Sequence, residues 1–243
     1  MANLQRVAIA SSQIEGDIIT LTPDQYHYLN RVLRLQSGDR FIALDGQGQW
    51  WLAQLTAQLD AQLLDPIPIS NELPLSVGLM VALPKTGMDD IVRQATELGV
   101  SHIQPLLSDR TLLNPSPNKL ERWRRIAKEA AEQAERQIVP HIYDPVSSQT
   151  AWSIHPGNSR YICAARTEST LLLNAIESSS LSSPLTLATG PEGGWTPSEI
   201  EAAIAVGWRP VSLGRRILRA TTAPIAALAI GAATLERIYS LKK

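Results

Sequence analysis

The sequence predicts a two-part fold, a β-rich segment followed by a larger α/β domain with a mostly parallel sheet. The first seventy or so residues alternate short apolar runs with turn residues, which is typical of strands joined by tight connections. From about residue 73 onward, apolar strands alternate with amphipathic helices. This alternation predicts a parallel sheet with helices on both faces.

Length and composition are those of an ordinary globular protein. The chain has 243 residues, of which 44% are hydrophobic and 19% charged. Its single cysteine, Cys163, excludes an internal disulfide, and its apolar surroundings predict a buried strand residue rather than a reactive thiol. The longest apolar run, residues 223–233, is shorter than the roughly 20 residues of a membrane span, and no signal peptide is evident. We therefore expect a soluble, cytoplasmic protein with no membrane partner.

The N-terminal part contains one hairpin and one short helix. Residues 40–55 form two apolar runs around a turn at residues 45–48, which predicts a β-hairpin. A short helical pattern near residues 23–35 carries Arg31 and Arg34. Three prolines between residues 66 and 74 then form a stiff connector, so we place the domains at residues 1–72 and 73–243.

The C-terminal part begins with a buried strand and a helix. Residues 76–83 are continuously apolar, as expected for a strand covered on both faces. The following helix has Asp89 and Asp90 in its first turn and Gly99 at its end. Residues 102–107 predict the next strand.

The longest helix of the chain is expected to start at Asn118. Asn118 is a suitable N-cap, with Glu121 three residues later, and Pro140 follows the helix. One face of this helix is apolar, formed by Leu120, Trp123, Ala127, Ala130 and Ala134.

The alternation continues to the end of the chain. Strands are predicted at residues 160–164, 185–189 and 210–213. Thr196 and Glu199 form a capping box that starts another helix. The last helix, from about Pro224, is apolar nearly all round and is expected to be buried.

Two loops between predicted strands and helices are candidates for ligand binding. Residues 189–194 and 213–222 follow strands, and ligands bind at the carboxyl ends of strands in open α/β sheets. Their glycines allow backbone amides to approach a ligand closely, although a tight turn alone explains the glycines equally well. Neither loop has the glycine spacing of a dinucleotide fingerprint or a P-loop.

The charge distribution contains one local basic cluster. The net charge is −1, which does not by itself indicate nucleic-acid binding. However, Arg209, Arg215, Arg216 and Arg219 fall within eleven residues that contain no acid. A solvated turn is one interpretation. Because these arginines directly precede an apolar helix, binding of phosphates or base carbonyls is the alternative.

Other polar residues give weaker indications. Glu129, Gln133 and Arg136 have spacings of four and three residues and are expected to share a helix face, which is usually a solvated face. We expect no metal, because Cys163 and the four histidines show no ligand spacing. These histidines are His27, His102, His141 and His155.

Five segments, in this order, resemble one known family. They are residues 31–39, 85–111, 122–140, 189–200 and 213–223. Together they resemble the RsmE-type 16S ribosomal RNA (uracil-N3) methyltransferases of the SPOUT superfamily, nearly from end to end. The resemblance implies an N-terminal PUA-like β-barrel that binds RNA and a C-terminal α/β trefoil-knot domain. It also implies a homodimer that uses S-adenosylmethionine and acts on 16S ribosomal RNA or the small ribosomal subunit.

The same resemblance implies the site residues. Arg219, Glu192 and Arg136 would be catalytic, and Arg31, Arg34, Arg215 and Arg216 would contact RNA. Glu129 and Gln133 would then lie beside the active site with Arg136. The cofactor would be held by Gly190, Pro191, Glu192, Gly193, Gly194, Leu213, Gly214, Ile217, Leu218 and Arg219.

The chain departs from the family pattern at two positions. Thr221 stands where a glutamate is common, and Tyr28 stands where a histidine is common. Any role of that glutamate must therefore be filled differently here. We expect Arg219, and secondarily Arg136, to stabilise the uracil anion, and Glu192 to orient the base or take its proton. Two alternatives are an RNA methyltransferase for another base or for ribose, and a non-catalytic RNA-binding protein.

Overall fold

The chain divides into two compact units. Unit 1 comprises Met1–Glu72 and Ala131–Val139, and unit 2 comprises Leu73–Ala130 and Pro140–Lys243. Residues 131–139 thus group with the N-terminal part although they lie in the middle of the chain. The computed structural model describes residues 4–68, 71–111, 114–154, 159–165, 169–179 and 183–240.

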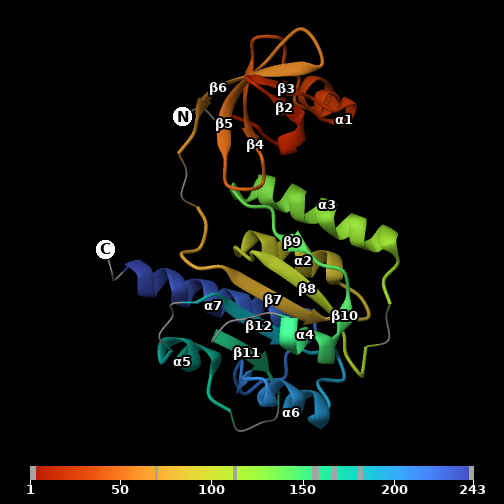
Figure 1. Ribbon diagram of the computed structural model, residues 1–243, viewed down its shortest axis with the longest axis vertical. Helices are drawn as coiled ribbons and strands as arrows, with labels where there is room; N and C mark the ends of the chain where they lie inside the picture. The colour runs from red at the N-terminus through yellow and green to blue at the C-terminus, as the bar shows by residue number, and fades with distance from the viewer. Residues whose placement is uncertain are drawn as a thin grey trace. The chain divides into compact units, whose positions relative to one another are not determined.

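Unit 1 is built on one six-stranded sheet (Figure 1). The strand order is β1-β4-β5-β6-β3-β2, in which β1 pairs with β4 in parallel and the other pairs are antiparallel. The predicted hairpin of residues 40–55 is confirmed as β4 and β5. The elements are β1 (Arg6–Ala8), η1 (Ser11–Gln13), β2 (Ile14–Glu15), β3 (Ile18–Thr20), α1 (Pro23–His27), η2 (Tyr28–Val32), β4 (Arg40–Leu44), β5 (Trp50–Leu55) and β6 (Asp60–Pro66).

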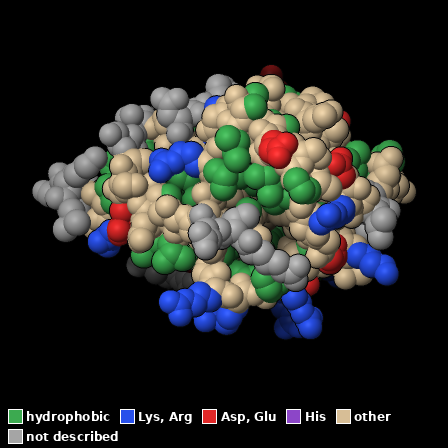
Figure 2. All heavy atoms as spheres, turned by 90° about the horizontal axis from the view of Figure 1, so that it is seen from below, with side chains coloured by type: hydrophobic (Ala, Val, Ile, Leu, Met, Phe, Trp, Pro, Cys, Tyr) green, Lys and Arg blue, Asp and Glu red, His purple; other side chains and the backbone are tan. Residues whose placement is uncertain are grey.

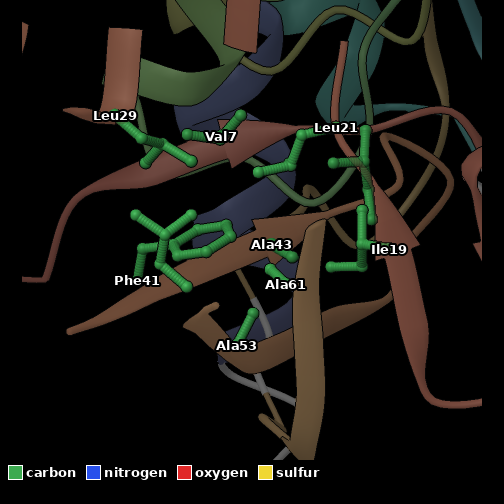
Figure 3. Packing of buried hydrophobic residues seen from close by; sticks show 10 residues of the cluster. Val7, Ile19, Leu21, Leu29, Phe41, Ala43, Ala53 and Ala61 are labelled. Atoms are coloured by element: carbon green, nitrogen blue, oxygen red, sulfur yellow. The ribbon is translucent and has the colours of Figure 1, made fainter. Parts of the chain in front are cut away.

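A small apolar core holds this sheet together. Figure 3 shows Leu29, from the helical segment, and Phe41, from β4, in the same cluster as small alanines of the neighbouring strands. Burying side chains of this kind contributes roughly 1.5–3 kcal/mol each for the larger ones. The buried members are Val7, Ile9, Ile19, Leu21, Leu29, Phe41, Ala43, Ala53, Leu55 and Ala61.

Residues 131–139 are fixed to unit 1 by a buried ion pair. Arg136 Nη2 lies 2.6 Å from Glu72 Oε2, and the Arg136 side chain is only 4% exposed. The other Glu72 oxygen accepts the backbone N–H groups of Gln137 and Ile138, at 2.9 and 3.0 Å. Glu132 accepts the N–H of Ala8 at 2.7 Å. Glu72 therefore joins the end of the first segment to the second segment of the same unit.

Unit 2 is a seven-stranded sheet in which every pair is parallel. The main order is β10-β8-β7-β12-β11-β13, with β9 beside β8. The strands are β7 (Val77–Ala82), β8 (His102–Leu107), β9 (His141–Ile142), β10 (Val146–Ser147), β11 (Ser159–Cys163), β12 (Leu185–Thr189) and β13 (Arg209–Val211). The helices are α2 (Met88–Glu97), α3 (Pro117–Gln133), α4 (Ser148–Ile154), α5 (Leu172–Glu177), α6 (Pro197–Ala205) and α7 (Thr222–Ser240).

Helices cover both faces of this parallel sheet, as predicted (Figure 1). On one face, Trp152 of α4 and Trp208 pack at 5.1 Å between ring centroids, over Met80 and Ile162 of the sheet. On the other face α7 contacts α2 and α5. A Cβ added to Gly231 of α7 would lie 3.1 Å from Leu185 Cδ2, so this glycine allows the close approach of helix and sheet.

Two predicted helix features differ from the structure. The helix α3 starts at Pro117, not after Asn118, because proline is favoured at the first helical position and needs no N–H partner there. The helix also ends at Gln133, and Glu135 has a left-handed φ of 56°. Arg136 therefore does not continue the helix, and the predicted face shared with Glu129 and Gln133 was wrong at that residue.

The final helix is apolar as predicted, but it is buried on one side only. Ala227, Leu228 and Leu235 are buried, whereas Ala229 and Ala233 are exposed. Figure 2 shows a face of the chain on which exposed hydrophobic side chains lie near Lys and Arg side chains. The large exposed hydrophobic residues of unit 2 include Ile154, Leu171, Leu173, Ile204, Val206 and Ile217.

Candidate functional site

The first candidate loop follows β12 at the carboxyl edge of the parallel sheet. Gly190 faces the indole of Trp195, whose Cε2 would lie 3.2 Å from an added Cβ. The Trp195 Nε1–H donates to the Cys163 carbonyl at 3.1 Å, which ties the loop to the end of β11. The N–H of Gly194 donates to the Pro191 carbonyl at 2.8 Å, and Gly194 has a φ of 69° that favours glycine. The loop therefore forms a closed turn.

Arg110 lies beside the first loop, although the sequence patterns did not single it out. It lies in the loop after β8, and its Nη1 donates to the Gly193 carbonyl at 2.5 Å. A Cβ on Gly193 would come within 3.0 Å of Arg110 Cδ, so the arginine packs directly on the glycine. The one available signal was its place after a parallel strand, where ligand-binding loops lie.

A buried carboxylate anchors the far end of the same loop. Glu199 is 4% exposed, and the predicted capping box with Thr196 is confirmed. Glu199 Oε1 also accepts the N–H of Asp109 at 3.1 Å and the hydroxyl of Ser148 at 2.8 Å. Because buried polar groups are costly to leave unpaired, this carboxylate fixes α6 to two neighbouring elements.

Glu192 connects the first loop to the segment after β7. Its Oε1 accepts the backbone N–H of Lys85 at 2.8 Å. Within the described residues its other oxygen, Oε2, has no hydrogen-bond partner, and the side chain is exposed. A carboxylate held at one oxygen keeps the other available to accept a proton or a hydrogen bond.

The second candidate loop follows β13, and several of its side chains are exposed. Ser212 Oγ accepts the N–H of Gly214 at 3.1 Å, and Gly214 has a φ of 115°. The carbonyl of Arg219 accepts the N–H groups of Thr222 and Ala223, both at 2.9 Å, which starts α7. The side chains of Arg215, Arg216 and Arg219 are exposed, and none has an acidic partner among the described residues.

The two loops line two adjoining cavities of about 160 and 240 Å³. They share Ile217 and Leu218 as common walls. Arg110 lines the larger cavity. Arg219 lines neither, but the residues on both sides of it, Leu218 and Ala220, line the larger one. Nine of the ten predicted cofactor residues line these cavities: Gly190, Pro191, Glu192, Gly193, Gly194, Leu213, Gly214, Ile217 and Leu218.

The walls of these cavities suit a cofactor with an apolar ring and several polar groups. Ile217 is 61% exposed, so a flat ligand placed against it would cover a large aliphatic side chain. The glycine-containing backbone of both loops supplies N–H and C=O groups for polar atoms. These features are compatible with S-adenosylmethionine.

Cys163 also lines both cavities, at the end of β11. Desolvation raises the pKa of its thiol to about 12. The thiol therefore stays protonated at neutral pH, and a protonated thiol is a poor nucleophile. This agrees with the prediction of a structural rather than a reactive cysteine.

The residues that line these cavities do not include Glu129, Gln133 or Arg136. Arg136 is buried in unit 1 against Glu72. Glu129 and Gln133 are exposed, and Glu129 Oε1 lies 3.7 Å from Arg125 Nε. The surroundings of Arg136 are those of a structural ion pair, because its charge is already matched by a carboxylate.

Arg31 and Arg34 lie on an unusual segment of unit 1. The helix α1 continues into the wider turn of η2, which ends at Val32, and Arg34 has a left-handed φ of 59°. Irregular turns of both kinds are frequent at functional sites. Both arginine side chains are exposed and have no acidic partner among the described residues.

Thr221 packs on the segment after β7. A Cβ added to Gly87 would lie 2.7 Å from Thr221 Cγ2, so the methyl group covers this glycine. The threonine that replaces the common glutamate therefore sits beside the loop that contacts Glu192.

Within the described ranges, no group of three or more His, Cys, Asp or Glu side chains is placed to hold a metal ion. His155 lies outside the described residues. None of the described helices has the length and apolarity that crossing a bilayer requires.

Comparison with known proteins identifies the family. Residues 71–232 match the RNA methyltransferase domain family, and residues 21–60 match the RNA methyltransferase PUA domain family. The chain belongs to the RNA methyltransferase family. The match to the PUA domain confirms the predicted PUA-like N-terminal fold, and this RNA methyltransferase carries its two candidate loops inside the matched catalytic domain.

Individual relatives cover almost the whole methyltransferase. It is 52% identical over 236 residues to ribosomal RNA small subunit methyltransferase E of Synechocystis sp., which covers 95% of this chain and 78% of the relative. The enzyme of the same name from Bacillus subtilis is 30% identical, over 91% of this chain and 93% of the relative. The crystal structure of ribosomal RNA small subunit methyltransferase E from Neisseria gonorrhoeae, bound to S-adenosyl methionine, has a TM-score of 0.83 and 30% identity. It covers 93% of this chain and 95% of that structure.

Proposed function

We propose that this RNA methyltransferase transfers a methyl group from S-adenosylmethionine to N3 of a uracil base in 16S ribosomal RNA, in the cytoplasm. The observation that carries the proposal is the meeting of two glycine-containing loops at the carboxyl edge of the sheet, with exposed Arg219 beside them. The named relatives, which act on small-subunit ribosomal RNA, support the substrate class.

The reaction requires the chain to stabilise a uracil anion. When bound, S-adenosylmethionine supplies an electrophilic methyl group. The N3 proton of uracil must leave, and the resulting charge spreads over O2 and O4 of the base. The Arg219 guanidinium has no acidic partner among the described residues, so it is available to donate hydrogen bonds to these oxygens. Arg219 is therefore the residue that we assign to charge stabilisation.

We assign Glu192 as the carboxylate that acts on the uracil ring. One of its oxygens is held by the Lys85 N–H, and the other is available to accept the N3 proton or to orient the ring. Arg136 has no part in this scheme, because its charge is matched by Glu72 within unit 1.

We assign RNA binding to unit 1 and to the second loop. In our division, residues 1–72 form the RNA-binding domain and residues 73–243 the knotted methyltransferase domain. Arg31 and Arg34 lie on an irregular segment and Arg215 and Arg216 beside the cofactor cavity, and none of the four is paired with an acid in the described part of the chain. Arginine donors suit the phosphates of a folded RNA.

A change at Arg31 tests this assignment. Arg31→Ala is expected to weaken binding of 16S ribosomal RNA several-fold while S-adenosylmethionine binds as before. Arg40, an exposed arginine of the same unit, provides the matched control as Arg40→Ala. Equal RNA affinity for both variants and the unchanged protein, measured by fluorescence anisotropy, would exclude Arg31 from the interface.

We propose that the enzyme is a homodimer formed through α7. Its partly exposed side lines a groove of about 640 Å³ whose walls are mainly apolar. The groove shares Leu213 and Gly214 with the smaller cofactor cavity. A second copy on this side would cover the exposed alanines, and light scattering should then give twice the mass of one chain.

Product analysis tests the proposed activity. The enzyme is incubated with methyl-labelled S-adenosylmethionine and small ribosomal subunits that lack the modification, and the RNA is digested to nucleosides. Label in 3-methyluridine supports the proposal, whereas label on a ribose 2′-oxygen or another base would establish the first alternative.

Calorimetric titration of S-adenosylmethionine separates the remaining alternative. Binding that is abolished by Gly193→Trp or Gly214→Trp would support the cofactor loops. A folded protein that binds no cofactor at millimolar concentration would be the non-catalytic RNA-binding protein.

A further inference from the structure

A polar groove lies beside the cofactor cavities in unit 2. It has a volume of about 750 Å³ and is formed by the segment after β7, the first turn of α2 and the first turns of α3. Pro84, Pro115 and Trp123 contribute apolar walls, and Asn118 lies at the rim with an amide that can donate and accept hydrogen bonds. Its polar lining consists otherwise of charged residues, namely Lys85, Asp89, Asp90, Arg93, Lys119 and Arg122, together with Thr86.

The charges of this groove do not cancel. Arg93 Nη1 lies 2.7 Å from Asp90 Oδ1, and Arg122 Nη2 lies 2.7 Å from Asp89 Oδ2. Both aspartates are therefore matched by arginines. Lys85 and Lys119 are exposed, and neither ammonium group has an acidic partner among the described residues. The groove thus presents two unmatched positive charges.

This groove is linked to the proposed active site through Lys85 and Glu192. The backbone N–H of Lys85 donates to Glu192 Oε1 at 2.8 Å, and Glu192 lines the larger cofactor cavity. Gly87, two residues further, is covered by the methyl group of Thr221 at the start of α7. If the target base of an RNA strand reaches Glu192, the neighbouring nucleotides of that strand would lie at the mouth of the groove.

We propose that this groove binds the backbone phosphates of the RNA next to the target uridine, with Lys85 and Lys119 as the phosphate contacts. The inference rests on the proposed function and adds a second RNA contact, located in the methyltransferase domain. Lysine binds phosphate as a point charge without sequence readout, which suits a site that positions the strand. The volume and the proline walls suit a nucleotide rather than a small anion alone.

The salt dependence of RNA binding tests the proposal. Each phosphate contact to single-stranded RNA contributes about 0.7 to the slope of log affinity against log salt concentration. Lys85→Gln and Lys119→Gln should each weaken binding of 16S ribosomal RNA several-fold and reduce the slope by about 0.7. Affinity for S-adenosylmethionine should not change, because the Lys85 contact to Glu192 uses the backbone.

The helix α3, which carries Lys119, also offers a matched control. Lys128 follows Lys119 by nine residues in α3, which turns it by about 180° to the opposite side of the helix. Lys128→Gln makes the same charge change outside the groove and is expected to leave both the affinity and the slope as they were. A general effect of net charge would instead weaken all three variants alike.

The outcomes separate this inference from the proposed function. If the unchanged enzyme methylates the RNA while Lys85→Gln and Lys119→Gln behave like Lys128→Gln, the groove assignment is overturned and the function stands. If the unchanged enzyme binds no RNA, both the groove assignment and the proposed function are excluded. The phosphate site is supported if the slope of log affinity against log salt concentration is reduced in Lys85→Gln and Lys119→Gln but not in Lys128→Gln, while methylation stays at uracil N3.

Discussion

The two loops that line the cofactor cavities are held in very different ways. The first loop, residues 189–194, is fixed by Arg110, by the bond of the adjacent Trp195 to β11 and by the Lys85 bond to Glu192. The second loop, residues 213–222, is held mainly at its two ends. Ser212, just before it, bonds Gly214 and the backbone of Thr170 and Leu172, and the Arg219 carbonyl accepts two N–H groups at the start of α7. Between these ends, the side chains of Arg215, Arg216 and Ile217 are exposed. One side of the site is thus built before any ligand arrives, whereas the other presents unmatched groups to it.

This difference suggests a division of roles. Contacts that fix the first loop come from elements far away in the sequence, so changes there should affect stability and cofactor binding together. The arginines of the second loop contact little else in the described chain, so changes there should affect chemistry or RNA binding with little cost in stability. Substitutions in and around the two loops test this contrast.

The largest expected effect is on the buried carboxylate behind the first loop. Glu199→Ala would leave the donors of Asp109, Ser148 and Thr196 without their acceptor. Buried donors without partners cost about 1–3 kcal/mol each, so we expect the free energy of unfolding to fall by on the order of 3 kcal/mol. Chemical denaturation measures this loss.

Glu201 provides the control on the same helix. It is exposed, and Glu201→Ala should change the free energy of unfolding by less than about 0.5 kcal/mol. Equal stabilities of the two variants would show that the first loop does not depend on the buried network, and the contrast between the loops would be lost.

Arg219→Ala tests the second loop and should leave the fold intact. Removing one donor that stabilises a developing negative charge typically lowers turnover by about 100-fold or more. The expected result is a loss of this size in kcat, with the affinity for S-adenosylmethionine and the melting temperature nearly unchanged. Turnover and calorimetric titration are measured on the same preparation.

The lysine variant shows which property of the arginine matters. Arg219→Lys keeps the charge but loses the planar set of donors. A turnover between those of the alanine variant and the unchanged enzyme supports hydrogen bonding to the base. Unchanged turnover in Arg219→Ala would remove this residue from the mechanism.

The sequence predicted the elements better than the contacts between them. The capping box of Thr196 and Glu199 is local, so the start of α6 could be predicted from four residues. The start of α3 was misplaced because Pro117 and Asn118 both carry helix-start preferences, and proline at the first position prevailed. Arg136 was assigned to a helix face that the left-handed turn at Glu135 ends.

In the candidate site, too, the positions of the loops could be predicted but the contacts between them could not. Both candidate loops follow predicted strands, so their position at the sheet edge could be expected from the alternating pattern. Arg110 and Gly193 are 83 residues apart, and Lys85 and Glu192 are 107 apart. No local periodicity relates such pairs, because they meet only through the order of the parallel strands. The same is true of the groove that Lys85 and Lys119 share.

The smallest expected effect concerns the contact between the loop after β8 and the first loop. Arg110→Ala removes one hydrogen bond to the Gly193 carbonyl and the packing on that glycine. A hydrogen bond from a charged donor at an exposed site is worth about 1 kcal/mol, so the affinity for S-adenosylmethionine should fall about fivefold. Because Arg110 is exposed, the melting temperature should hardly change. Calorimetric titration measures the affinity.

Arg125, an exposed arginine of α3 with only a 3.7 Å approach to Glu129, is the matched control as Arg125→Ala. If Arg110→Ala binds the cofactor as tightly as this control, the first loop keeps its shape without the arginine. The remaining ties, at Trp195 and Glu192, would then be sufficient, and the contrast would rest on the connection to β11 and to the segment after β7. If the affinity falls as expected, the loop after β8 belongs to the cofactor site although it precedes both glycine loops in the chain.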